Sequence, residues 1–204
     1  MPPLGTGLIG ARRYQSNRFR RTVTRMTERF RSGAGRLCLD FIRTLRYRGT
    51  PAETEELPDA AAWGAWIDQL GPFSGPVRPA SAQEARALRE AVYSLLTEAA
   101  MRPAVRQRLN RFAALPVPAP SLTSSGELRW QAEDPASAML ALLARDALDL
   151  VTSPEFGRVR RCAGAKCGAL FLDTSRPGTR RWCSMDVCGN QAKKSTYRAK
   201  ATAS

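Results

Sequence analysis

The sequence contains no histidine, and this absence excludes the chemistry that depends on an imidazole. Ser-His and Cys-His nucleophile pairs cannot form, and no histidine is available as a general acid or base. Gly-rich phosphate-binding loops are also lacking, because Gly5, Gly7 and Gly10 have the spacing of neither a P-loop nor a dinucleotide-binding turn. We therefore expect that the protein is not an enzyme.

Long apolar runs and acidic residues are scarce as well. No stretch of about 18 apolar residues is present, and the first residues lack the apolar segment of a secretory signal, so we expect a cytoplasmic protein that does not enter a membrane. The 18 Asp and Glu are outnumbered by 32 Lys and Arg, which gives a net charge of +14. Such a surplus makes polyanions, above all nucleic acid, the expected partners. The alternative is that the charge only keeps the protein in solution.

Residues 1–35 have few apolar anchors and a single acidic residue, Glu28, among eight arginines. We predict a poorly ordered basic extension. One interpretation is an arm that follows a phosphate backbone, and another is a transit-like peptide. A third is that translation starts at Met26 and that the preceding residues are not part of the protein.

Between residues 36 and 154 apolar side chains recur at the spacing of one helical face, which predicts a mostly helical domain. Asp59 and Asp134 are expected helix caps, and Pro103 is an expected helix start. Alternating apolar residues on either side of Ser124-Ser125-Gly126 predict a small β-hairpin. The predicted fold class is therefore mostly α (α+β), a helical domain with one hairpin.

Several side chains of this domain have simple expected environments. Trp63, Trp66 and Cys38 lie on apolar helical faces, so we expect core residues, with Cys38 a buried, reduced thiol. Arg89 falls on the polar side of its helix and is expected in solvent. The acidic residues Glu53, Glu55 and Glu56 lie in a Pro-flanked polar stretch and are expected in an exposed loop rather than in a catalytic site.

Four of the five cysteines crowd the last fifth of the chain, as Cys162-x4-Cys167, fifteen residues, and Cys183-x4-Cys188. Two such pairs can wrap a tetrahedral zinc ion, and four protein ligands leave no open position for water or substrate. We predict one structural Zn²⁺ held by these four thiolates. Two disulfides and an iron–sulfur cluster are the alternatives, although a reducing cytoplasm and the unusual spacing disfavour them.

The segment 155–204 around these cysteines is strongly basic, with eleven Lys and Arg against two Asp from residue 158 onward. If a helix starts near Ser184, Gln191 and Lys194 share one face of it with Arg198. We expect a zinc-finger domain with a C-terminal basic helix that contacts nucleic acid. The alternative is a solvated tail. The expected contact residues are Arg176, Arg180, Arg181, Gln191, Lys193, Lys194 and Arg198.

The stretches Arg180-Arg181-Trp182-Cys183-Ser184-Met185 and Cys188-Gly189-Asn190 resemble the signature of the CGNR zinc-finger proteins. Upstream, the stretches from Leu37 to Leu45 and from Leu88 to Ala91 are similar to the ABATE domain that precedes this finger, so the resemblance covers about 36–200. It implies a bacterial transcription regulator linked to stress, whose finger binds DNA and whose helical domain senses a signal or mediates assembly.

Two residues depart from that family's pattern. Gln191 stands where the fourth signature letter is arginine, and Arg43 replaces the usual asparagine. Our first hypothesis is a DNA-binding regulator in which Gln191 is a candidate base reader, since glutamine pairs well with adenine. The alternative is a zinc module that binds a protein or RNA. The sequence leaves open whether a small-molecule effector binds and whether the chain forms a homodimer.

Overall fold

The computed structural model describes residues 29–201, without the side chains of residues 196 and 199–201. Most of the predicted N-terminal extension, residues 1–28, lies outside this range. In the described part of the chain the α-helices are α1 (Leu37–Ile42), α2 (Ala60–Leu70), α3 (Gln83–Thr97), α4 (Pro103–Ala113), α5 (Pro135–Thr152) and α6 (Asn190–Ala201). A 3₁₀ turn, η1 (Pro154–Arg158), follows α5, and a π-helical turn, η2 (Met185–Gly189), precedes α6.

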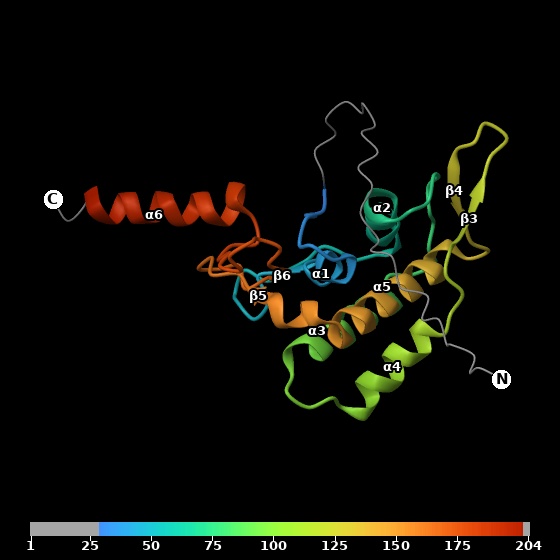
Figure 1. The fold of residues 1–204 in the computed structure, drawn as a ribbon, viewed down its shortest axis with the longest axis horizontal. Coiled ribbons are helices and arrows are strands. Elements are labelled where there is room, and N and C mark those ends of the chain that lie inside the picture. Colours follow the sequence, from blue (N-terminus) through green and yellow to red (C-terminus); the bar gives the residue numbers. More distant parts are fainter. Residues whose placement is uncertain (1–28, 202–204) are drawn as a thin grey trace, which may run out of the picture.

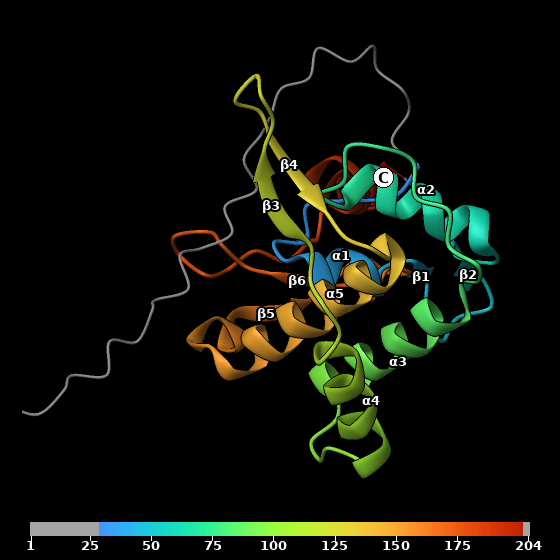
Figure 2. The same ribbon diagram turned by 90° about the vertical axis from the view of Figure 1, so that its right-hand side faces the viewer.

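The strands form three antiparallel pairs within residues 29–201. The predicted hairpin is present and projects from the body of the molecule (Figure 2). The mostly helical fold with small sheets is thereby confirmed. The pairs are β1 (Leu45–Arg46) with β2 (Thr54–Glu55), β3 (Ala119–Leu122) with β4 (Leu128–Gln131), and β5 (Val159–Arg161) with β6 (Leu170–Leu172).

Local signals place the helix starts where the sequence indicates them. An Asp59 carboxylate oxygen accepts a hydrogen bond of 2.8 Å from the Ala62 amide, which caps α2. Asp134 caps α5 in the same way by accepting from the amides of Ala136 and Ser137. Such caps satisfy backbone donors that have no partner inside the helix. Both predicted caps are confirmed.

The core forms where α5 passes between α1, α3 and α4, as Figure 1 shows. Trp63 and Trp66 stack with ring centroids 5.4 Å apart, and Phe41 meets the edge of Trp66 at the same distance. All three rings and the Cys38 thiol are fully buried. The prediction that the tryptophans and Cys38 are core residues is confirmed.

The expected positions of several charged residues are wrong. Arg89 is buried, at 3% exposure, and its guanidinium donates two hydrogen bonds of 2.6 Å to the carboxylate of Glu55. Glu56 is also shielded from solvent and pairs with Arg46 at 3.1 Å. Only Glu53 is exposed as expected. A guanidinium can be buried here because a carboxylate from another segment satisfies its charge.

The packed part of the chain also begins earlier than expected. Phe30 is 2% exposed and Ala34 is fully buried, although both lie in the segment that we assigned to the extension. The Gln69 side chain fixes Phe30 by accepting from its amide and donating to its carbonyl, at 3.0 and 2.8 Å. These residues therefore belong to the core of the helical domain.

The zinc-finger segment packs on this same core. The amide of Leu172 in β6 donates a 2.7 Å hydrogen bond to the carbonyl of Ala34, and Phe171 beside it is fully buried. Arg36 adds a polar connection, because its guanidinium pairs with Asp146 in α5 and with Glu155 in η1. One continuous apolar core therefore joins the helical domain to the C-terminal segment.

We expect Gly35→Ala to loosen this connection. Gly35 has φ +97°, and a Cβ there would lie 2.8 Å from the Cβ of Leu172. Overpacking plus backbone strain should lower the free energy of unfolding by about 2–3 kcal/mol. Gly33→Ala is the matched control, since Gly33 has φ +87° but no atom within 4 Å of an added Cβ. Equal losses for the two variants in urea unfolding would contradict the predicted steric contact with Leu172.

Candidate metal centre and nucleic-acid interface

Four short elements bring the predicted metal ligands together. Cys162 follows β5, Cys167 lies in the turn before β6, Cys183 precedes η2, and Cys188 lies within η2. Their Sγ atoms all lie within 4.8 Å of one another. Cys167 and Cys183 are 3.7 Å apart, and Cys183 and Cys188 are 3.8 Å apart.

This geometry fits a tetrahedral zinc ion. Zn–S bonds of about 2.3 Å place the sulfur atoms of a tetrahedron roughly 3.8 Å apart. Disulfide sulfurs are separated by only about 2.05 Å, and all five cysteines in the described residues are free. The four-cysteine set fits one structural Zn²⁺, and the disulfide alternative is wrong.

The backbone of the finger is shaped around the sulfur atoms. The amides of Gly164 and Cys183 both lie 3.4 Å from the Sγ of Cys162, where they can donate to a thiolate. A Cβ on Gly164 would lie 3.2 Å from the Cβ of Cys167 and 3.4 Å from the Sγ of Cys188, so a larger residue would crowd the ligands. Ser184 caps η2 by accepting from the Val187 amide at 3.3 Å.

The thiols are too close together to ionise independently. A hydrogen bond with Cys183 lowers the pKa of Cys167 to about 4. The same hydrogen bond raises the pKa of Cys183, and burial raises the pKa of Cys188 to about 11. Like charges at this separation disfavour each other. A divalent cation removes that repulsion and allows all four cysteines to bind as thiolates.

A second group of residues, around Asp173, stabilises the backbone of the finger, and the sequence did not predict this role. Asp173 is buried and accepts from the amide and hydroxyl of Ser175, at 2.9 and 2.6 Å, and from the amide of Arg180 at 2.9 Å. The hydrogen bonds from Ser175 lower the pKa of Asp173. The only available signal was a carboxylate among so many cations, since Asp173 and Asp186 are the sole acidic residues from residue 158 onward.

Arg180, an expected nucleic-acid contact, is directed into the finger instead. Its Nε donates to the carbonyl of Trp182 at 2.8 Å, and its guanidinium also bonds the carbonyl of Cys183. The guanidinium carbon lies 4.8 Å from the centre of the Phe171 ring. Arg180 thus holds the backbone next to a metal ligand in place.

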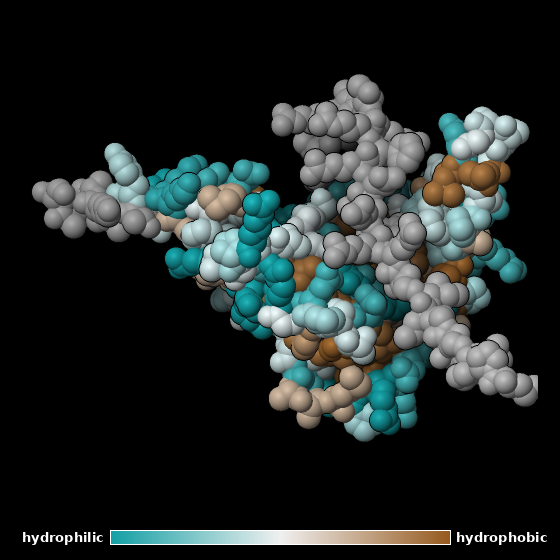
Figure 3. Space-filling view, in the orientation of Figure 1, coloured by the Kyte–Doolittle hydropathy of each residue, from teal (hydrophilic) through white to brown (hydrophobic). Residues whose placement is uncertain are grey.

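The other expected contact residues lie on open surface. Figure 1 shows that α6 extends away from the body of the molecule, and Figure 3 shows that its visible face is mostly hydrophilic. Arg181 lies over the Trp182 ring at 5.1 Å and remains exposed. Tyr197, on the same helix as the expected contacts, is 77% exposed. The exposed members of the expected set are Arg176, Arg181, Gln191, Lys193, Lys194 and Arg198.

The fold and the metal centre define a zinc-finger protein in which a helical domain precedes a finger with four cysteine ligands. Residues 35–154 match the ABATE family model, described as "Putative stress-induced transcription regulator", and residues 158–201 match the CGNR zinc finger. The chain belongs to the ABATE family, with a CGNR zinc finger after the ABATE domain. No curated protein matches the chain. Neither matched family is an enzyme family, and no helix within the described range is long and apolar enough to cross a membrane.

Proposed function

We propose that this protein is a cytoplasmic, DNA-binding regulator of transcription whose zinc finger presents α6 to the duplex. The observation that carries the proposal is the position of α6, a helix of 12 residues that extends from the metal centre with exposed cations along it. At a rise of about 1.5 Å per residue it is roughly 18 Å long. The major groove of B-DNA is about 12 Å wide and admits such a helix.

The zinc centre would give α6 a fixed starting direction. Cys188 lies in η2, which continues directly into α6 at Asn190. Gln191 is in the first turn of the helix, where recognition helices commonly meet base edges, and its amide can pair with adenine. Lys194 and Arg198 follow on the same face and can reach phosphates or bases, while Arg176 and Arg181 can bind the backbone. In this arrangement the helical domain would sense a signal or mediate assembly.

The first experiment is selection of bound duplexes from a random-sequence DNA pool by the zinc-loaded full chain at about physiological salt, where non-specific binding is weak. Enrichment of a common motif would establish sequence-specific DNA binding. If a structured RNA competes far better than any duplex, the alternative function, contact with RNA, replaces the proposal. If neither nucleic acid is retained, a protein partner replaces it.

We expect Lys194→Gln to weaken DNA binding through the loss of one phosphate contact. Each neutralised phosphate contributes about 0.9 to the slope of log K against log salt, so the slope should fall by about that amount. The slope is measured by fluorescence anisotropy with a labelled duplex between about 50 and 200 mM salt. Arg108→Ala on α4 is the matched control, because Arg108 is also exposed but lies on a helix that packs against α3 and α5. Equal slopes for Lys194→Gln and the unaltered protein would argue against α6 as the DNA-binding element.

A further inference from the structure

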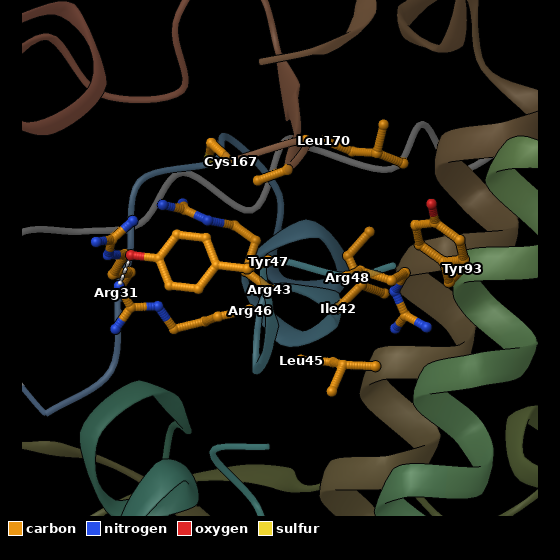
Figure 4. A pocket seen from close by; sticks show the side chains of 12 residues that line it. Arg31, Ile42, Arg43, Leu45, Arg46, Tyr47, Arg48, Tyr93, Cys167 and Leu170 are labelled. Carbon is orange, nitrogen blue, oxygen red and sulfur yellow. Dashed lines mark hydrogen bonds between the residues drawn. The ribbon is translucent and has the colours of Figure 1, made fainter. Parts of the chain in front are cut away.

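A hollow lies at the junction between the helical domain and the zinc finger. One wall comes from the segment around α1 and β1, with Arg31, Arg43, Arg46 and Arg48, and Tyr93 of α3 closes one side. The opposite wall is the finger segment 167–170, which begins at a metal ligand. Figure 4 shows the side chains of Arg31 and Arg46 on one side, with Arg48 and Tyr93 on the other.

The lining of this hollow is strongly one-sided in charge. It has four arginines and, among the residues that the structure describes, no carboxylate. Three of these arginines form ion pairs with carboxylates that do not line the hollow, and these pairs partly neutralise their charge. These pairs are Arg43 with Asp40, Arg46 with Glu56, and Arg48 with Glu90.

Two guanidiniums still have unused donors. Arg31 has neither an ion-pair nor a hydrogen-bond partner within residues 29–201. The Nε of Arg46 is buried and has no acceptor. The Arg31 guanidinium, which lines the hollow, therefore has donors that an oxygen atom of a ligand can use, whereas an oxygen atom can reach the buried Arg46 Nε only if its surroundings move. The zinc centre is an alternative reason for the arginines, because four thiolates and Zn²⁺ carry a charge of about −2 and attract cations. However, no described cysteine sulfur accepts a hydrogen bond from the Arg46 Nε.

The backbone at the hollow is strained in the way that ligand sites often are. Tyr47 has φ +54°, which is unfavourable for a residue with a side chain. Its hydroxyl accepts a 2.8 Å hydrogen bond from the guanidinium of Arg46, and this contact orients both groups. On the finger side Gly168 also has a positive φ, +56°, which turns the chain between Cys167 and β6.

We propose that this hollow binds a small oxyanion, the carboxylate or phosphate group of a small molecule. Guanidinium groups match the geometry of both groups and bind them with two parallel hydrogen bonds. The hollow has a cavity volume of about 30 Å³, which suits a small anion rather than a large ligand. A DNA backbone fits less well, because the arginines line a hollow whose opposite wall is the finger segment 167–170.

A bound anion would connect the two parts of the protein. Arginines of the helical domain and the segment that carries Cys167 would meet across it, so its binding would stabilise one orientation of the finger. The regulatory consequence, a change in DNA affinity, rests on the proposed function. Anion binding itself does not, and it can be measured without DNA.

The experiment is isothermal titration of the zinc-loaded full chain with sodium phosphate and, separately, with sodium succinate, at constant ionic strength and without DNA. We expect saturable binding of one anion per chain, and the stronger of the two titrations identifies the ligand class. Arg31→Ala should weaken it by roughly tenfold or more, because one charge-assisted contact is lost. Arg108→Ala, an exposed arginine on α4, should leave it unchanged.

Arg31→Ala should fold normally, since within residues 29–201 Arg31 forms no hydrogen bond or ion pair, and its charge only partly offsets the burial that raises the pKa of Glu56. The thermal midpoint of the variant without anion serves as the check. Absence of saturable binding for both anions would overturn the proposal, and so would equal affinities for Arg31→Ala and the unaltered protein. A variant that binds phosphate normally but shows a smaller salt slope for DNA would also overturn it. That result would assign Arg31 to the DNA-binding surface instead.

Discussion

Replacing Cys183 with serine is expected to abolish zinc binding and to unfold residues 158–201. Cys183 lies 3.7 Å from Cys167 and 3.8 Å from Cys188, so its thiolate completes the four-coordinate set. In small zinc modules the apparent binding free energy, about 10–16 kcal/mol, is largely folding free energy. Metal analysis should find no bound zinc, and hydrogen exchange should show loss of protection in β5, β6 and η2.

The helical domain should survive this change in a weakened form. Trp63 and Trp66 belong to the same continuous core as Phe171 and Leu172 of the finger, in which β6 covers α1. Loss of that cover should lower its thermal midpoint without removing its cooperative unfolding. If a chelator unfolds the whole chain in one step, the domain and the finger form a single folding unit instead.

Cys38→Ala is the control for the ligand set. Cys38 is fully buried in α1, and burial raises the pKa of its thiol, so it is a packing residue and not a metal ligand. The variant should bind one zinc per chain with unchanged affinity and lose about 1 kcal/mol of stability from the missing sulfur. Loss of zinc from Cys38→Ala would mean that the four-cysteine assignment is wrong.

The features that could be predicted from the sequence are those with local causes. The spacing of the four cysteines was sufficient to predict the metal ligands, because a thiolate pair needs only a short loop to grip one metal ion. Asp59 and Asp134 predicted two helix starts, since a cap bonds amides only two or three residues away. Apolar spacing placed Trp63 and Trp66 in the core for a similar reason.

The features that could not be predicted depend on contacts between distant segments. Arg89 looked exposed because it lies on the polar side of its own helix, and nothing near it in sequence indicates that Glu55 covers it. Arg180 looked like one more surface cation, but the buried Asp173 and the carbonyl of Cys183 fix it in the finger. Phe30 was not predicted to be buried, because the arginines around it in the sequence indicated an exposed basic segment.

The second large effect is expected for Arg89→Met, which leaves the carboxylate of Glu55 without its main partner. Arg89 is 3% exposed and bonds both oxygens of Glu55 at 2.6 Å. Removing one member of a buried ion pair typically costs 3–5 kcal/mol. The Glu55 side chain is 30% exposed, so solvent reduces the cost of leaving it unpaired. We therefore expect a loss at the lower end of this range, about 3 kcal/mol in the free energy of urea unfolding at pH 7.

Arg102→Ala is the matched control, because Arg102 forms an ion pair with Glu98 in which both side chains are exposed, at 64% and 40%. Exposed pairs contribute only about 0–1 kcal/mol, so this variant should be nearly neutral. A loss for Arg89→Met that is no larger than for Arg102→Ala would show that burial of the pair contributes nothing measurable.

The loss should also depend on pH, and the direction follows from the pKa of Glu55. Burial is the largest single influence and would raise this pKa, but the hydrogen bonds from Arg89 and the Leu57 amide, together with the charges of Arg89 and Arg86, outweigh it and lower the pKa. The pair therefore stabilises the protein above the unfolded-state pKa of about 4.3, and that contribution is lost as the pH falls through the lower folded-state value. In Arg89→Met the carboxyl can be protonated at mildly acidic pH, so the difference from the unaltered protein should shrink between about pH 7 and pH 4.

The double variant Arg89→Met with Glu55→Gln should recover part of the loss at pH 7, because it removes the unpaired charge. A deficit that stays constant with pH and is not relieved by Glu55→Gln would assign the effect of Arg89 to packing alone.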